Sequence, residues 1–328
     1  MRFLFSITFC FVLTQSSQAQ GLWKYIVQSP EKAIKTYDTS YVKPLLNKLT
    51  LRYFFNVKQA ELKVQPKDDP NVFRYKAGDF LRYGMGFGYR WLILNYSYGI
   101  DPLKKGANGD KTIRNQDLQM NIFGKSWLYD LRAQWYRGFT YKGVFRPDLD
   151  IKAFGGSFRH NFNHEKYSFK NTYDQTQWQQ KSAGAALAGI NLGYSKITAD
   201  SSITFGNNTD FIFPDHENFN VALGGGYSYT FVYKKHFFAT YTLTLFLDNH
   251  FIGSGKNFVF RDNLALNMLA ESRFGLGYNS EKIYIGIQGT FHDLPGKLSN
   301  NVAYSYRYNN LKLLFVHRLN FNPFKKHE

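Results

Sequence analysis

Residues 81–98 have the sequence LRYGMGFGYRWLILNYSY, and this stretch decides the fold. From Leu81 to Trp91 every second residue is bulky and apolar, whereas glycine and arginine fill the positions between them. Side chains alternate between the two faces of a β-strand, so the large groups share one face and the small or cationic groups share the other. After Trp91 the bulky residues move to even positions, as a tight turn at Arg90 and Trp91 would produce. An apolar face opposite a thin polar one is typical of a membrane β-barrel, with lipid outside and a crowded lumen inside.

The composition favours the same class of protein. Aromatic residues make up 19% of the 328 residues, and after the N-terminus no apolar run approaches the length of about 20 residues that a membrane helix requires. Aromatic girdles at the two membrane surfaces of a barrel account for such a composition. A soluble all-β protein is the alternative class.

The N-terminus predicts export. Arg2 precedes an apolar run over residues 3–13, and Ser17 and Ala19 stand where a signal peptidase needs small residues. We therefore expect a signal peptide over residues 1–19, a periplasmic extension over residues 20–47, a barrel over residues 48–321 and a tail over residues 322–328, in the outer membrane of a Gram-negative bacterium. The single cysteine, Cys10, lies in the signal peptide, so disulfides and thiol chemistry are excluded from the mature chain.

The alternation continues along the chain and predicts an antiparallel barrel of about 12 strands, with 14 or 10 as alternatives. Two regions leave the count open. Residues 167–196 form either one interrupted strand or two, and the bulky residues change phase at Asn309 and Asn310, where either a β-bulge or a hairpin turn lies. An even strand number, with tight turns at one end and long loops (one of them containing residues 146–148) at the other, favours twelve strands and a bulge.

Several blocks of the sequence resemble a known family. They include GMGFGYRWLILNYSYG, DLQMNIFGKSWLYDLRAQWYRGFTY and YSFKNTYDQTQWQQKSAGAALAG, and they occur in order over most of the chain after the signal peptide. The chain thereby resembles an exported family of Bacteroidota proteins that is catalogued as a domain of unknown function, number 4421. The resemblance implies an outer-membrane barrel and brings no established activity.

Charged residues collect on the face that the alternation turns inward. A lumen rich in arginine would select anionic solutes, as rings of Arg and Lys do in pores. The structural alternative is a lattice of ion pairs that fills a narrow barrel, which the glycines of the inner face favour. The candidate lumen residues are Arg52, Lys58, Arg82, Arg90, Asp130, Arg132, Asp248, Glu271 and Arg273.

A glutamine-rich stretch is the second candidate site. It either folds into the lumen as a constriction or binding segment, or forms a polar strand with a loop at the outer rim. Its residues are Asp174, Gln175, Gln177, Gln180, Lys181 and Ser182.

A barrel enzyme that hydrolyses lipid or peptide is the alternative function. His160, His164 and Ser182 supply the residue types for nucleophilic catalysis, but their spacing matches no motif. No cysteine pattern or His-x-His spacing indicates a metal, and no cofactor is expected. The net charge of +17 indicates anionic partners, and an exported chain meets outer-membrane lipids, lipopolysaccharide and small anionic solutes rather than nucleic acid. The oligomeric state stays open.

Overall fold

The computed structural model describes residues 37–66, 71–77, 80–89, 92–100, 114–124, 126–200, 203–205, 209–211, 216–254, 257–260, 267–299 and 302–321. The predicted signal peptide, most of the predicted extension, the predicted tail and Arg90 lie outside these residues. Within the described residues, no helix combines the length and the apolar character that crossing a membrane requires.

Twelve long strands occur in the described part of the chain. They are β2 (Lys48–Pro66), β4 (Phe80–Tyr89), β5 (Leu92–Ile100), β6 (Arg114–Phe123), β7 (Trp127–Tyr141), β8 (Val144–Asn161), β10 (Ala183–Thr198), β13 (His216–Tyr233), β14 (Phe237–Ser254), β16 (Asn267–Asn279), β17 (Ile283–Ser299) and β18 (Val302–Asn320). The short elements are β1 (Val42–Pro44), β3 (Phe73–Lys76), α4 (Phe169–Thr172), β9 (Gln177–Gln179), β11 (Ile203–Phe205), β12 (Thr209–Phe211) and β15 (Asn257–Phe260).

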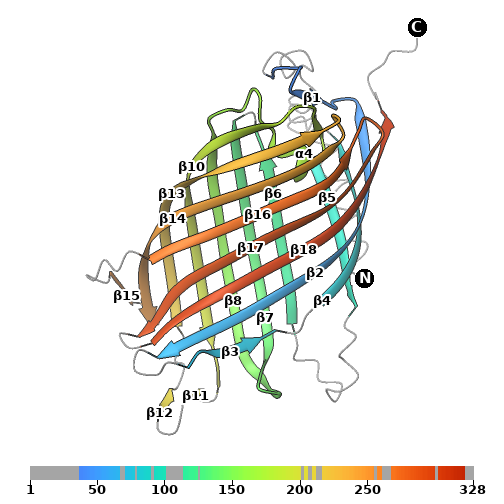
Figure 1. Cartoon of the computed structure of the whole chain (residues 1–328). Coiled ribbons are helices and arrows are strands. Elements are labelled where there is room, and N and C mark those ends of the chain that lie inside the picture. Colours follow the sequence, from blue (N-terminus) through green and yellow to red (C-terminus); the bar gives the residue numbers. More distant parts are fainter. Residues whose placement is uncertain are drawn as a thin grey trace, which may run out of the picture.

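The long strands form a closed antiparallel barrel (Figure 1). Ten strands make the paired ring, in the order β18, β17, β16, β14, β13, β10, β8, β7, β3 and β2, with β18 pairing β2. The ring closes through β3, where Lys76 pairs with Thr140 of β7. The hairpin β4–β5 extends the wall from β2, and β6 extends it from β7. The prediction of an all-β antiparallel barrel is confirmed.

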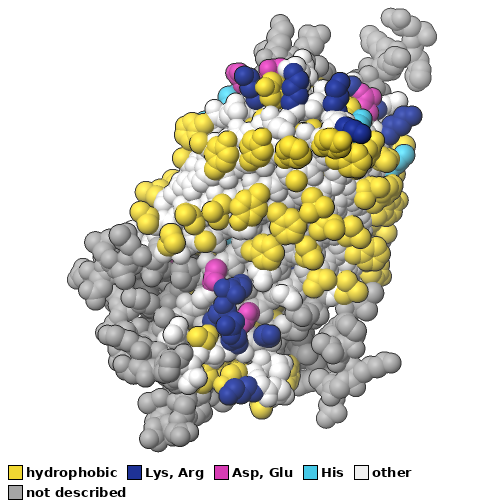
Figure 2. Space-filling view, in the orientation of Figure 1, with side chains coloured by type: hydrophobic (Ala, Val, Ile, Leu, Met, Phe, Trp, Pro, Cys, Tyr) yellow, Lys and Arg dark blue, Asp and Glu magenta, His cyan; other side chains and the backbone are white. Residues whose placement is uncertain are grey.

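The outer surface carries the bulky residues, as the alternation predicts. On β14 the exposed fraction of the residue is 53% for Tyr241 and 54% for Leu247, whereas Thr242 and Thr244 between them are buried. On the face that Figure 2 shows, apolar side chains spread over β14 to β18 and β2 and form the apolar belt of the barrel. Since an exposed apolar belt of this extent is unfavourable in water, its place is against lipid.

The barrel is longer than a bilayer requires. Strands β2 and β18 have 19 residues each, and β8, β13 and β14 have 18 each, whereas about 9–11 residues cross the hydrocarbon core. The surplus lies at the end away from the tight turns, where the outer surface becomes polar. There the interior holds an apolar cluster, formed by Ala60, Leu62, Val64, Phe73, Tyr75, Ala77, Tyr136, Phe139, Leu149, Ile151, Ala153, Ile197, Tyr304 and Tyr306.

This change of polarity corrects one prediction. Strand β18 pairs β2 without interruption, and Asn309 and Asn310 oppose Gln59 and Lys58, so neither a bulge nor a turn lies there. Tyr308 faces inward and is buried, while Leu311 faces outward and is 46% exposed. The bulky residues change phase because the strand leaves the apolar belt at this point, and its large side chains move to the interior.

One loop prediction is wrong, and the open choice for residues 167–196 is decided. Residues 146–148 lie within strand β8, and the turn before it is made by Lys142 and Gly143, both with positive φ. Residues 167–196 contribute one wall strand, β10, and the chain before it folds into α4 and β9 instead of a strand of the wall.

Candidate functional site in the barrel interior

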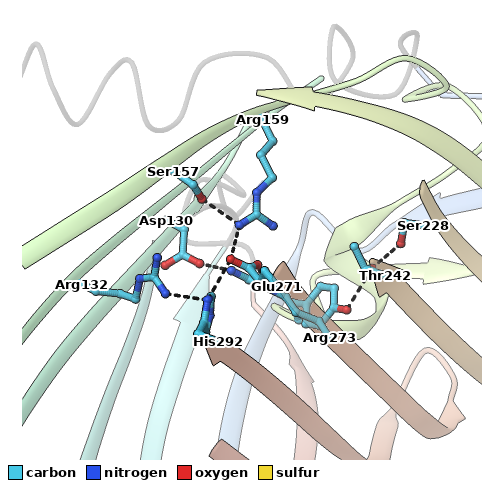
Figure 3. A network of polar contacts seen from close by, with 10 residues as sticks. Asp130, Arg132, Ser157, Arg159, Ser228, Thr242, Glu271, Arg273 and His292 are labelled. Carbon is cyan, nitrogen blue, oxygen red and sulfur yellow. Dashed lines mark hydrogen bonds and ion pairs between the residues drawn. The ribbon is translucent and has the colours of Figure 1, made fainter. Parts of the chain in front are cut away.

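A network of charged side chains crosses the lumen between opposite walls (Figure 3). Arg159 on β8 donates from Nη2 to Glu271 Oε2 on β16 at 2.5 Å and to Ser157 Oγ at 2.9 Å. Arg273 on β16 donates from Nε to Glu271 Oε1 at 2.5 Å and from Nη2 to Asp130 on β7. The four charged side chains are almost fully buried. They link the two walls by paired charges, which low-dielectric surroundings demand.

Two further groups extend this network. His292 Nδ1 lies 3.1 Å from Glu271 Oε2, and Arg132 Nη1 lies 2.8 Å from the same ring nitrogen. A guanidinium is always a donor, so Arg132 donates to His292 when Nδ1 carries no proton. With a neutral imidazole, three arginines face two carboxylates, and the cluster carries a net charge of +1.

Residues 162–182, which we call the plug segment, join β8 to β10 and fill the lumen at the end where the tight turns lie. The segment is held by side chains of several walls. Thr172 Oγ1 lies 2.8 Å from Thr240 Oγ1 on β14, and Asn279 Nδ2 on β16 donates to Asn171 Oδ1 at 2.8 Å. Trp178 Nε1 donates to the carbonyl of Lys235 at 2.7 Å. The plug segment therefore contacts the ring on more than one side.

Two buried arginines of the wall support the plug segment through its backbone. Arg52 Nη1 on β2 donates to the carbonyl oxygen of Asp174 at 3.1 Å. Arg318 Nη2 on β18 donates to the carbonyl oxygen of Gln175 at 2.7 Å. The positive φ of Gln175, 58°, turns the chain so that these adjacent carbonyls meet the two guanidinium groups.

The side chain of Asp174, which lies outside the wall strands, stabilises this turn. Its Oδ1 accepts hydrogen bonds from Thr176 N at 2.8 Å and Thr176 Oγ1 at 2.6 Å. Burial raises the pKa of the Asp174 carboxyl above its usual range, and the opposing effects of Lys170, of the two bonds from Thr176 and of Arg52 are smaller.

A short strand before the barrel, β1, pairs with the plug segment. Strand β1 pairs antiparallel with β9, with Val42 opposite Gln179 and Pro44 opposite Gln177. Lys43 forms an ion pair with Glu281 in the β16–β17 turn, so the same short strand contacts both plug and barrel. The part of the chain before the first wall strand is thereby connected mechanically to the plug.

One glycine of the wall makes room for the plug segment. A Cβ on Gly275 would lie 2.3 Å from Thr172 Cγ2, which is far inside van der Waals contact. Rotation of Thr172 would relieve the clash only by breaking its bond to Thr240. Gly275 is therefore required for the plug to approach β16 so closely.

The predicted lumen residues face the interior wherever the structure describes them. Arg52, Lys58, Asp130, Asp248, Glu271 and Arg273 are buried, and Arg82 and Arg132 are half-buried. The network unites Asp130, Arg132, Glu271 and Arg273. Arg52 lies at the plug instead. Asp248 accepts a hydrogen bond from Asn220 Nδ2 at 3.1 Å on the neighbouring strand.

The residues predicted as a constriction divide into two groups. Asp174, Gln175 and Gln177 are buried within the lumen as part of the plug segment. Gln180 is half-buried and donates from its backbone to the carbonyl of Tyr41, and Lys181 is exposed. Ser182, directly before β10, forms hydrogen bonds with the backbone of Val232 near the end of β13.

The three residues considered for hydrolysis are engaged elsewhere. The ring of His160 packs against Trp127 at 4.3 Å and Phe162 at 4.8 Å, on the outward face of β8. Ser182 Oγ accepts from Val232 N at 2.9 Å. His164 lies in the turn after β8. Among the described residues, no hydrogen bond joins any two of the three, so this geometry gives the hydrolysis hypothesis no support.

Three functional residues were not predicted. Arg159, His292 and Arg318 complete the network and the plug support, and each lies at an inward position of its strand. The alternation alone could have found all three, since each occupies an inward position of a strand with regular alternation. A further feature, a cavity of about 40 Å³, lies beside Arg132, Asn191, Asn220 and Tyr304. No group of three or more His, Cys, Asp or Glu side chains gathers as a metal site within the described residues.

The fold and interior define a class: a membrane β-barrel with an apolar belt, a plug at one end and an ionic network across its lumen. The chain belongs to the family described as a domain of unknown function (DUF4421), which matches residues 36–318. This confirms the family that the sequence blocks resemble. No curated protein matches the chain.

Solved structures with a similar architecture are outer-membrane barrels. The outer membrane protease OmpT from Escherichia coli is 8% identical, with a TM-score of 0.38, over 84% of this chain and 97% of that one. The toluene transporter TodX from P. putida is 7% identical, with a TM-score of 0.27, over 87% and 94%. A FadL homologue from Pseudomonas aeruginosa is 8% identical, with a TM-score of 0.22, over 84% and 91%. Because these scores are low, the likeness carries no argument about activity.

Proposed function

We propose that this chain is an outer-membrane channel of a Gram-negative bacterium for small anionic solutes, and that the plug segment closes it in the present conformation. The main support is the way Arg52 and Arg318 are held. Each donates to backbone carbonyls of the plug segment, at 3.1 and 2.7 Å, and not to a carboxylate of the wall. If the plug leaves, Arg52 loses its carbonyl acceptor, and Arg318 keeps only its Nη1 bonds to the carbonyls of Ser280 and Ile283. The freed N–H groups would then face the lumen, where anions would replace the carbonyl oxygens.

The charge of the remaining interior supports the same selectivity. Among the residues that the structure describes, five buried cations outnumber the three buried acids of the wall strands. The cations are Arg52, Lys58, Arg159, Arg273 and Arg318, and the acids are Asp130, Asp248 and Glu271. A surplus of fixed positive charge in a narrow lumen attracts anions and repels cations.

The pairing of β1 with the plug segment supports control of channel opening from the periplasm. The pairing of β1 with β9 joins the chain segment before the barrel to the plug. A force or a binding partner acting on that segment would reach the plug directly. The channel would thus be opened by withdrawal of the plug, with rearrangement of the ion pairs that cross the lumen, and not by widening of the barrel.

Conductance in planar bilayers tests the proposal. A variant in which residues 166–181 are replaced by a short glycine-serine linker should give open steps that prefer chloride over potassium. The change of Arg52 and Arg318 to glutamine in this background should lower that preference. A plug-free barrel that retains its β-sheet signal but conducts nothing would contradict the proposal. If this variant does not fold, openings of the full-length barrel under applied voltage decide: anion preference supports the channel, and silence or cation preference refutes it.

A further inference from the structure

A patch of cations lies on the outer surface next to the apolar belt. It consists of Lys63 on β2, Arg74 and Lys76 on β3, and Arg307 on β18, and we call it the outer cation patch. The strand register brings these residues together, because Lys63 pairs with both Arg74 and Ser305, and Arg307 pairs with Glu61. Figure 2 shows Lys and Arg side chains, with acidic ones among them, gathered directly beside the apolar belt.

Two acids order the patch without neutralising it. Arg74 Nη1 lies 3.2 Å from Glu61 Oε1, and Arg307 donates to Asp293 Oδ2 from Nη2 at 2.5 Å and from Nε at 3.2 Å. Four cations and two acids give the patch a net charge of +2. The side chains of Arg74 and Arg307 are 52% and 36% exposed, so both guanidinium groups remain accessible.

The patch lies at the depth of lipid headgroups. The apolar belt ends at Leu311 on β18, and Arg307 follows four residues further along the same outward face. Four residues of strand cover about 13 Å, which a tilt of about 40° reduces to about 10 Å along the membrane normal. Headgroups occupy roughly 5–8 Å on each side of the hydrocarbon core, so long cationic side chains near this position reach the phosphates.

The patch faces the outer leaflet if the barrel has the orientation that such proteins share. The tight turns Lys234–His236 and Ser280–Lys282 and the last wall residue, Asn320, lie at the opposite end of the barrel. Single-chain bacterial barrels place their short turns in the periplasm. The outer leaflet of a Gram-negative outer membrane is made of lipopolysaccharide, whose phosphates lie at the edge of the hydrocarbon.

We propose that the outer cation patch binds a phosphate group of lipopolysaccharide. Arginine pairs with phosphate through two N–H groups, and the carboxylates of Glu61 and Asp293 hold the two guanidinium planes in place before the lipid arrives. The two lysines add charge without fixed geometry. This inference shares the outer-membrane location with the proposed function but does not depend on conduction.

Binding of purified lipopolysaccharide to the full-length refolded barrel tests the inference. Replacement of Lys63, Arg74 and Arg307 by glutamine should weaken binding on the order of 100-fold, since each cation near an anionic membrane surface contributes about a fivefold effect. The matched control replaces three cations of the opposite end, with Lys234→Asn, Lys235→Asn and Lys282→Gln. It should bind as the wild type does. Equal weakening in both variants would overturn a localised site.

The ligand's identity is tested with three further probes. Dephosphorylated lipopolysaccharide should bind the wild type as weakly as intact lipopolysaccharide binds the triple glutamine variant. Phosphatidylglycerol vesicles and inorganic phosphate should not compete at concentrations where lipopolysaccharide saturates. Equal binding of dephosphorylated lipopolysaccharide, or full competition by either simple anion, would overturn the assignment. The conductance of the same variants should be unchanged, which separates this proposal from the channel.

Discussion

Arg159 and Glu271 meet across the lumen, with 2.5 Å between Nη2 and Oε2, although they belong to strands β8 and β16 that are not neighbours in the sheet. Glu271 also accepts from Arg273 and lies against His292, so one carboxylate holds together groups from three strands. The barrel is therefore braced through its interior as well as along its ladders. Removal of this carboxylate would leave the buried Arg159 without a carboxylate acceptor and Arg273 with Asp130 alone.

The first prediction concerns this brace. Glu271→Ala should lower the free energy of unfolding by about 3–5 kcal/mol, because a broken buried ion pair leaves unpaired charge behind. Glu61→Ala removes the partner of the exposed Arg74 and should cost no more than about 1 kcal/mol. Urea unfolding of the two variants in the same lipid vesicles makes the comparison. Equal losses would show that the network does not stabilise the barrel.

The second prediction concerns the fit of the plug. Gly275→Ala should displace the plug segment, because the new methyl group would overlap Thr172. Amide hydrogens of residues 167–180 should then exchange faster, by a factor of ten or more for a loss of about 1.4 kcal/mol in docking. Gly124→Ala is the control, since a Cβ there lies at an ordinary 3.4 Å from its nearest neighbour. Unchanged exchange in Gly275→Ala would refute the tight contact.

The third prediction is a pH dependence. Burial raises the pKa of Asp174, so the folded state binds its proton more tightly than the unfolded state does. The stability that protonation contributes is complete below the unfolded pKa and is lost as the pH rises through the folded pKa. Asp174→Asn keeps the acceptor for Thr176 and removes the charge. The melting temperature of the variant should therefore exceed that of the wild type by a margin that grows as the pH rises from 4 to 8. Parallel thermal scans of the two proteins measure this margin. A margin that does not change with pH would contradict the raised pKa of Asp174.

The fourth prediction locates the membrane edge. Two variants each carry a single cysteine, Phe55→Cys or Lys63→Cys, in a chain without residues 1–19. In vesicles, a charged thiol reagent should label the cysteine at position 63 and leave the one at position 55 unlabelled. Both side chains point outward on β2, eight residues apart, but Phe55 lies in the apolar belt and Lys63 lies beyond it. Labelling at both positions or at neither would refute the proposed edge.

Much of the fold follows from the alternation of residues, because a period of two assigns each side chain to a face. It predicts the inward position of Arg52, Asp130 and Glu271 before any partner is known. The alternation does not predict which side chains pair across the lumen. Arg159 and Glu271 are 112 residues apart, and strand order decides which cation meets which acid.

Two features resisted prediction for physical reasons. The phase change near Asn309 has the signature of a bulge, but a strand that leaves the membrane produces the same sequence pattern. The plug segment has no periodicity, since its polar groups are satisfied by distant wall residues such as Arg318 and Asn279. Its own residues indicate a constriction in the lumen as one of two alternatives, and only the distant partners decide between that and a loop at the rim.

The central claim is that movement of the plug segment opens the lumen. Thr172 Oγ1 and Thr240 Oγ1 are 2.8 Å apart, so cysteines at both positions can form a disulfide between plug and wall. Thr230 Oγ1 and Thr240 Oγ1 are also 2.8 Å apart, but both lie on the wall, and cysteines there make the control. In single-channel recordings, the oxidised Thr172→Cys/Thr240→Cys barrel should stay closed and should regain anion-preferring openings after reduction, while the control opens in both states. Equal openings of the oxidised and reduced plug-to-wall variant would contradict the account.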